Sequence, residues 1–148
     1  KFSSTKKEKL KDIKICNNTK WQKNHLKSIQ IAYRSSPYFE FFEDYFIEIF
    51  EKKENFLIDI SVRSIEIIFR MLETNLKYKM TDKYQTNYDL VSDLRNLSVR
   101  KRKVTKNLIR PYHQVFEANQ GFISNLSVID LIFNEGNGSL NYLNQSNM

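Results

Sequence analysis

The chain has 148 residues, of which 41% are hydrophobic and 28% are charged, a composition typical of one folded domain with its own core. This composition excludes a chain that is disordered throughout, and no apolar run approaches the roughly 20 residues of a membrane-spanning helix. The first residues are polar and basic, so we expect no signal peptide, and the single cysteine, Cys16, excludes an internal disulfide and favours a cytoplasmic protein.

The formal net charge of +7 is unevenly distributed. Residues 1–36 contain ten basic and two acidic residues, and residues 99–110 contain six basic residues and no acidic one. Folded together, the two segments could form a basic surface that attracts nucleotides, phosphates or nucleic acid. The alternative, which we favour, is two solvated segments of a lysine-rich sequence. Nucleic acid as a partner would rest on charge alone, and we do not favour it.

A short strand and a helix are the first predicted elements. Residues 11–16 alternate between polar and apolar, as a strand does. Thr19 and Gln22 have the spacing of a capping box, which predicts a helix from there to about Arg34. One face of that helix is apolar at helical spacing, and it carries Trp21, His25, Ile29, Ala32 and Tyr33.

Two further helices follow after short connections, so neighbouring helices should pack antiparallel or at a steep angle. Ser36 as N-cap and Pro37 as the first helical residue predict the start of the second helix, and Asp59 predicts the start of the third. The apolar stripe of the second helix comprises Phe39, Phe42, Phe46, Ile49 and Phe50. The residues that the third helix is expected to bury are Val62, Ile65, Ile68, Phe69 and Leu72.

The second half of the chain has weaker patterns. Residues 78–81 could form a strand, residues 89–97 could form a short helix, and the basic residues 99–110 are expected to be exposed. Two last helices are predicted over 127–136, ended by its glycine, and over 139–143. Together the elements predict a mainly α protein, of α+β type through its short N-terminal strand, in a single domain over all 148 residues.

The two histidines are the candidate general bases. On a helix face like this one, the ordinary role of His25 is packing, with its ring nitrogens hydrogen-bonded; the alternative is a proton shuttle or a phosphate contact, since imidazole titrates near neutral pH. For His113, beside the basic segment, we favour a structural or simply exposed role. The sequence has no glycine-rich phosphate loop and no Cys/His cluster, so it predicts no metal site and names no cofactor.

Polar residues also border positions that look buried in the last third of the chain. Buried polar groups need partners, and helix capping would supply them for most of this group without any ligand, which is the interpretation we favour. The aromatic run at 33–46 could stack on a sugar or a base, but its helical spacing favours a core role. The polar residues concerned are Gln114, Asn125, Ser127, Asp130 and Asn134.

Three stretches of this sequence resemble one known family. The pattern Trp21-x3-His25-x3-Ile29-x3-Tyr33-x3-Pro37-Tyr-Phe-Glu40 resembles the signature of the WbqC-like family. So do Tyr112-x-Gln114-Val-Phe116 and the block from Gly121 to Gly136, and the resemblance extends over residues 11–143. The N-terminal part usual in the family is missing here. The resemblance therefore implies that residues 1–148 are the helical C-terminal portion of a larger α/β protein.

WbqC-like proteins are associated with bacterial O-antigen and capsule gene clusters, and some are described as aminoacyl-type transferases acting on nucleotide-linked sugars. The resemblance thus implies a cytoplasmic bacterial transferase in lipopolysaccharide biosynthesis, which adds an acyl or aminoacyl group to a nucleotide-linked sugar. The alternative is a non-catalytic binding or scaffold module in a polysaccharide-assembly complex. The sequence leaves the oligomeric state open.

For the enzyme, the expected general base or phosphate contact is His25, with Tyr33 and Asp130 as orienting catalytic groups. This hypothesis predicts a pocket where His25 meets the segment 112–134. The scaffold hypothesis predicts no cleft at His25. The ligand contacts expected for the enzyme are Trp21, Gln114 and Asn125.

Overall fold

The computed structural model describes residues 9–75, 77–87, 95 and 110–145, and over these residues the protein is mainly helical, as predicted. A 3-10 turn at Leu10–Asp12 precedes the helices, and a second one at Gly136–Gly138 joins the last two. The α-helices are α1 (Trp21–Tyr33), α2 (Phe39–Glu51), α3 (Leu57–Met71), α4 (Glu117–Gln120), α5 (Val128–Glu135) and α6 (Ser139–Gln145).

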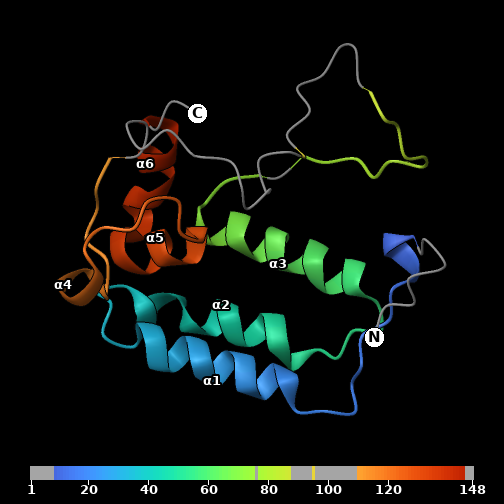
Figure 1. Ribbon diagram of the computed structural model, residues 1–148, viewed down its shortest axis with the longest axis horizontal. Coiled ribbons are helices and arrows are strands. Elements are labelled where there is room, and N and C mark those ends of the chain that lie inside the picture. The colour runs from blue at the N-terminus through green and yellow to red at the C-terminus, as the bar shows by residue number, and fades with distance from the viewer. Residues whose placement is uncertain (1–8, 76, 88–94, 96–109, 146–148) are drawn as a thin grey trace.

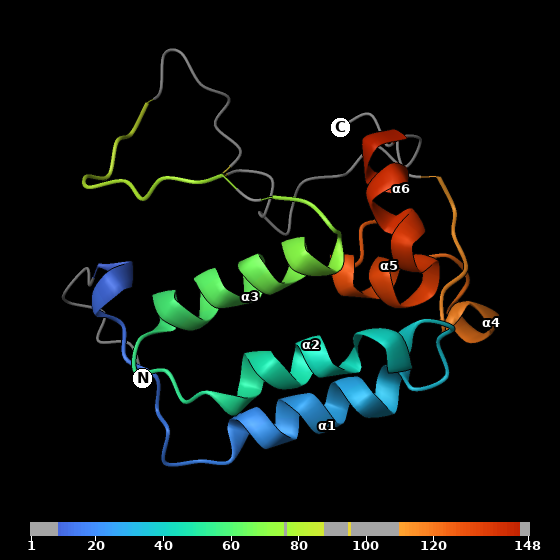
Figure 2. The same cartoon turned by 180° about the vertical axis from the view of Figure 1, so that it is seen from behind.

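The first three helices form a layer with α2 in the middle. Figures 1 and 2 show α1, α2 and α3 side by side, each antiparallel to the next, with α5 and α6 against one end of the layer. The predicted antiparallel packing is therefore confirmed. Phe133 of α5 lies at the centre of the core, with its ring 5.0 to 5.1 Å from the rings of Tyr33, Phe39 and Phe46. The remaining core residues are Phe42, Ile49, Ile67, Met71, Leu72 and Ile132.

The strand predicted at 11–16 is replaced by one antiparallel bridge, between Lys14 and Phe56, and the described residues contain no β-strand. Two backbone hydrogen bonds of 2.9 Å flank the bridge, from Ile15 to Asn55 and from Leu57 to Ile13. Pairing stops there because the chain turns at Leu10–Asp12 on one side and α3 begins on the other. The larger α/β protein implied by the resemblance stays a prediction.

The side chains predicted to cap the helices bind other partners. The hydroxyl of Ser36 donates to the carbonyl of Tyr33, so it satisfies the end of α1 instead of the start of α2. Gln22 donates to the side chain of Asn17 at 2.9 Å, and no side chain caps α1. Asp59 lies inside the first turn of α3, where its charge suits the helix dipole. The helices thus exist where predicted, but the predicted caps are wrong.

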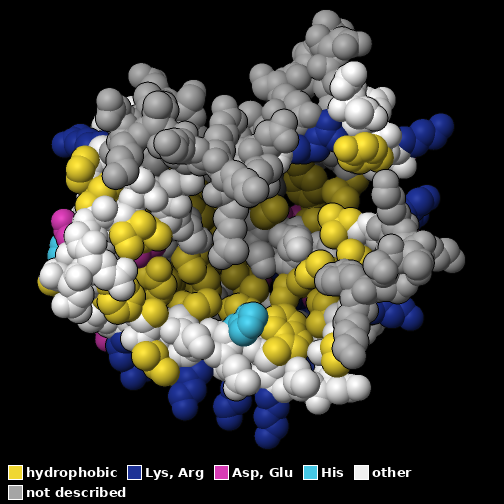
Figure 3. All heavy atoms as spheres, viewed as in Figure 1, with side chains coloured by type: hydrophobic (Ala, Val, Ile, Leu, Met, Phe, Trp, Pro, Cys, Tyr) yellow, Lys and Arg dark blue, Asp and Glu magenta, His cyan; other side chains and the backbone are white. Residues whose placement is uncertain are grey.

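Helix α3 is apolar around most of its circumference, and only part of it is buried. Ile67 and Met71 face the core, whereas Ile65, which was expected to be buried, is 47% exposed. Val62 and Phe69 are half-buried. The prediction fails because α2 and α5 cover one side of the helix and leave a second apolar stripe beside it. Figure 3 shows apolar side chains gathered on this face of the molecule.

Residues 77–87 form neither helix nor strand and are exposed, so the strand predicted at 78–81 is not formed. Tyr78 donates its hydroxyl to Glu66 of α3 at 2.9 Å, which ties this segment to the layer. The helix predicted at 89–97 and the exposed segment predicted at 99–110 lie outside the described residues, apart from two single positions.

The C-terminal helices follow the prediction closely. Gly121 and Gly136 have φ values of +68° and +56°, and they end α4 and α5 in a conformation that favours glycine. Helix α6 extends two residues beyond the predicted 139–143. In the described part of the chain, no helix combines the length and the apolar character that a membrane crossing requires.

Candidate functional site

The residues predicted to form a site gather at the two ends of α1. Trp21 and His25 lie in its first two turns, and Tyr33 is its last residue. Tyr33 lies eight positions after His25, which corresponds to about 12 Å along the helix axis. Asp130 lies with Tyr33. The expected catalytic trio is therefore split: Tyr33 and Asp130 meet, and His25 stands apart from them.

At the start of α1, three aromatic rings meet edge to face. The centroid of the His25 ring lies 5.4 Å from that of Trp21 and 6.3 Å from that of Phe50 on α2. The His25 side chain is exposed, so it is not the buried packing histidine that the helix pattern favoured. The indole N–H of Trp21 is buried and makes no hydrogen bond. An exposed imidazole on an aromatic support is accessible to a ligand.

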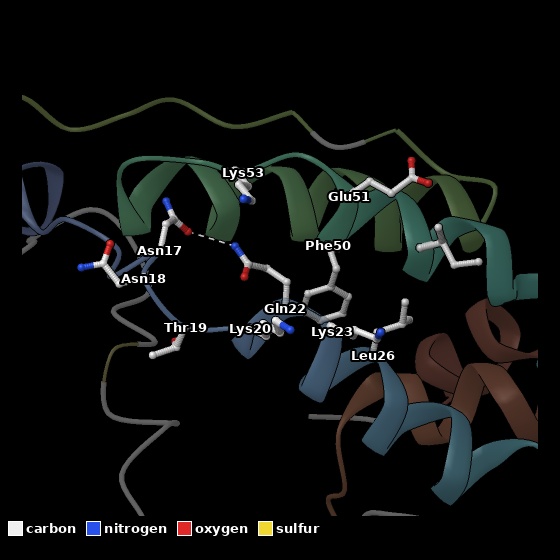
Figure 4. Close-up of a pocket in the computed structure, with 11 residues that line it drawn as sticks. Asn17, Asn18, Thr19, Lys20, Gln22, Lys23, Leu26, Phe50, Glu51 and Lys53 are labelled. Atoms are coloured by element: carbon white, nitrogen blue, oxygen red, sulfur yellow. Dashed lines mark hydrogen bonds between the residues drawn. The ribbon is translucent and has the colours of Figure 1, made fainter.

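A cavity of about 370 Å³ opens beside these rings, between the loop 17–20, the first turns of α1 and the end of α2. Phe50 lines it, together with Lys20, Lys23 and Lys53 (Figure 4). No described residue of the segment 112–134 lines this cavity. The pocket expected where His25 meets that segment is therefore not found here, because the segment packs at the other end of α1.

Side-chain hydrogen bonds fix the rim of the cavity. Asn17 donates its amide to the carbonyl of Glu54 at 2.9 Å and accepts the 2.9 Å bond from Gln22, so it joins the start of α1 to the connection between α2 and α3. Arg63 of α3 donates to the carbonyls of Ile49 and Lys52 and pairs with Glu54 at 2.9 Å. The loop and the end of α2 are thus held in place from both sides.

The other end of α1 holds a buried carboxylate between two tyrosines. Asp130 is 2% exposed and accepts a 2.7 Å hydrogen bond from the hydroxyl of Tyr112. Burial, together with the nearby charge and hydrogen bond of Asp130, raises the pKa of Tyr33 to about 12. Burial and the same carboxylate also raise the pKa of Tyr112 well above its ordinary value. Both phenols therefore stay protonated, and Tyr112 donates to Asp130. The capping role that we favoured for this carboxylate is therefore wrong, because no side chain caps α5 in the described part of the chain.

Gln114 and Asn125 shape the loop next to this cluster. Gln114 is 3% exposed and makes two 2.9 Å hydrogen bonds with the backbone of Ile123, one as donor and one as acceptor. Asn125 is exposed at a φ of +59°, a conformation that asparagine tolerates. His113 is exposed, 3.3 Å from a carboxylate oxygen of Glu117. Gln114 thus acts in the structure of the loop. Among the described residues, no group of three metal-ligating side chains occurs.

The pocket lysines are the candidate binding residues that sequence reasoning did not select. Lys20 and Lys23 belong to the basic segment 1–36, whose charge was the available signal. Lys53 lies in an acidic stretch, and only the packing of α2 against α1 brings it to the same cavity. Figure 3 shows a row of basic side chains along the edge of the molecule where α1 lies.

The fold and the site define a small helical domain with a lysine-lined pocket. Comparison with protein families matches residues 2–106 to the WbqC-like protein family, and because the match spans more than half of the chain, the chain belongs to this family. The match contains all the residues that line the pocket. It ends before residues 112–116 and 121–136, so it does not test the resemblance of those two stretches. Comparisons with curated proteins and with solved structures give no match.

Proposed function

We propose that this protein transfers an acyl or aminoacyl group to a nucleotide-linked sugar in bacterial O-antigen or capsule biosynthesis, in the cytoplasm. Membership of the WbqC-like family supports this context, since the resemblance implies it. The observation that carries the proposal is the exposed His25 beside Phe50, because the ring of Phe50 also lines the cavity. His25 does not itself line the cavity, but the centroid of its ring lies 6.3 Å from that of Phe50, which does.

In this proposal His25 is the general base. The amino group of the sugar attacks the carbonyl carbon of an activated acyl donor, such as a thioester, and His25 accepts the proton that the amine loses. The new C–N bond forms as the bond to the leaving group breaks, and the leaving group departs with the electron pair. General base catalysis of this kind contributes about 10² to 10⁴ in rate. The ring of Trp21 contacts His25 edge to face and does not itself line the cavity.

The remaining predicted residues act as positioning residues. The ring of Tyr33 packs against Phe133 beside the Asp130 carboxylate, which anchors the end of α1 to α5, and Gln114 holds the neighbouring loop. Asn125 forms the turn before α5. These residues influence His25 only through the position of α1. Their replacement should therefore lower stability first, and lower the rate only when α1 shifts.

The test is an acyl-transfer assay with the full chain, a uridine-diphosphate-linked amino sugar and a set of acyl and aminoacyl thioesters. We expect His25→Gln to lower kcat by about 10² or more with little change in KM. The matched control is His113→Gln, since His113 is also exposed but lies away from the cavity. Equal activity of the two variants would remove His25 from catalysis.

A scaffold function is the second candidate, and the second apolar stripe of α3 favours it. The stripe is partly exposed, with Ile65 at 47%, and an exposed apolar face on a small domain is typical of an interaction surface. Production of surface polysaccharide in cells that depend on the protein separates the two functions. The scaffold predicts a loss with Ile65→Glu and none with His25→Gln, whereas the transferase predicts the opposite. The stripe consists of Ile58, Val62, Ile65 and Phe69.

A further inference from the structure

We infer that the cavity at the start of α1 is a binding site for a nucleoside diphosphate, with the phosphates against its lysines and the base against Phe50. This inference rests on the proposed function, because it names where the nucleotide part of the sugar donor or acceptor binds. The cavity volume of about 370 Å³ lies within the range of small-molecule sites, roughly 300 to 1,000 Å³.

The charges around the cavity favour an anion. Lys20, Lys23 and Lys53 line it, and among the described residues none of the three forms an ion pair. Figure 4 shows Lys20 and Lys23 on the α1 side and Lys53 on the opposite side, and Glu51 also lines the cavity, so three positive charges face one negative charge. Gathering three positive charges is unfavourable until an anion neutralises them. Two linked phosphates would contact lysines on both sides at once.

The backbone and the amide side chains add neutral donors. No side chain caps α1, so its first N–H groups remain for water or a ligand. Gln22 uses one amide hydrogen in its bond to Asn17, which leaves the second for another acceptor. Lysines and neutral donors together suit the many acceptor oxygens of a diphosphate.

The apolar part of the lining suits a flat ring. Phe50 lines the cavity beside Leu26 and Ile47. The edges of Trp21 and His25 support the Phe50 ring at centroid distances of 6.3 Å each, so its orientation is fixed before any ligand binds. Aromatic side chains that are already oriented stack on nucleic-acid bases without regard to sequence. Lysines alone would accept any anion, and Phe50 makes the site favour a nucleoside diphosphate over inorganic phosphate.

The direct test is isothermal titration of the full chain with uridine diphosphate and adenosine diphosphate at moderate salt. We expect binding of at least one of them, weakened about tenfold by Lys53→Gln and further by Lys20→Gln with Lys23→Gln. The matched control is Lys27→Gln, an exposed lysine of α1 that does not line the cavity. Absence of binding, or equal weakening by Lys27→Gln, would overturn the inference, since the latter indicates diffuse attraction only.

Stacking has its own test. Wild-type protein should bind uridine diphosphate about tenfold more tightly than inorganic pyrophosphate, a comparison that needs no variant. Phe50→Leu should abolish that difference while leaving pyrophosphate binding unchanged, with circular dichroism confirming the fold. If pyrophosphate binds as tightly as the nucleotide to the wild type, the base does not contact Phe50 and the inference fails.

The failures of the site and of the function can be told apart. Lysine-dependent binding of uridine diphosphate without any acyl transfer keeps the site and removes the transferase. If the protein transfers acyl groups and Lys53→Gln does not change the KM for the nucleotide-linked sugar, the transferase function stands and the proposed binding site is wrong.

Discussion

The two ends of α1 differ in every physical respect. At the C-terminal end, Tyr33 is packed against Phe133 and lies beside the Asp130 carboxylate, which is 2% exposed and accepts a hydrogen bond from Tyr112. At the N-terminal end, His25 is exposed and three lysines line a cavity, and within the described part of the chain no side chain caps the helix and none of these lysines forms an ion pair. One end has its polar groups satisfied within the protein, and the other leaves them for a partner.

The comparison teaches that resemblance and chemistry need not point to the same residues. Asp130 and Tyr33 look like catalytic groups in the sequence, yet Asp130 already accepts a hydrogen bond from Tyr112, and Tyr33 is packed beside it with a raised pKa. The cavity instead lies at the start of α1, where no described side chain caps the helix. A satisfied polar cluster contributes to stability, whereas unsatisfied charge at a cavity is the usual mark of a binding site.

Phe133→Ala should give the largest effect, because it removes the centre of the buried end. Phe133 is 0% exposed and contacts three other aromatic rings, so we expect a loss of about 3 to 5 kcal/mol in the free energy of unfolding. Urea unfolding measures it. The control Phe41→Ala, at a residue 64% exposed, should stay within about 0.5 kcal/mol. Similar losses in both variants would contradict the assigned core.

Asp130→Ala should come next. It removes the acceptor of the Tyr112 hydroxyl and the carboxylate beside Tyr33, and a buried donor without a partner costs about 1 to 3 kcal/mol. Both phenols are half-buried, and we expect the free energy of unfolding, measured with urea, to fall by about 2 to 3 kcal/mol. Adding Tyr33→Phe and Tyr112→Phe should recover part of the loss. No recovery would mean that the cost comes only from the void that the shorter alanine side chain leaves.

Patterns within one helix were readable from the sequence. The stripe Phe39, Phe42, Phe46 and Ile49 is buried as predicted, because the helical period alone decides which residues share a face. The caps were not readable, since a hydroxyl such as that of Ser36 has several backbone acceptors within reach. The exposure of Ile65 depended on which sides of α3 other helices cover, and no local pattern contains that information.

The candidate site was predictable in part. The separation of His25 from Tyr33 follows from the helix rise alone, so the sequence already indicated that the expected catalytic trio could not meet at one point. The pairing of Tyr33 with Asp130 joins residues 97 positions apart, and the sequence offered it only through a family resemblance. Lys53 joined Lys20 only because α2 folds back along α1.

The pH dependence of stability sharpens the contrast through the buried end. The pKa of Tyr33 is raised to about 12 and that of Tyr112 is raised as well, so above pH 10 the unfolded chain releases protons that the folded chain keeps. This stabilisation is complete below about pH 10 and is lost as the pH rises toward 12. The free energy of unfolding should fall over that range.

Urea unfolding of the wild type and of the double variant Tyr33→Phe and Tyr112→Phe measures this contribution, since lysines titrate in both proteins alike. The wild type should show the steeper decline between about pH 10 and 12. Parallel curves would mean that the two phenols titrate normally in the folded state.

His25→Gln should give the smallest effect on stability, so a loss of activity in this variant would not be caused by unfolding. The His25 side chain is exposed, and its ring contacts are two aromatic edges, so we expect a change within about 0.5 kcal/mol in urea unfolding. At the buried end, even Tyr112→Phe, which removes one 2.7 Å hydrogen bond, should cost about 1 kcal/mol. If His25→Gln destabilises as much as Tyr112→Phe, then α1 has two structural ends, and His25 packs rather than reacts.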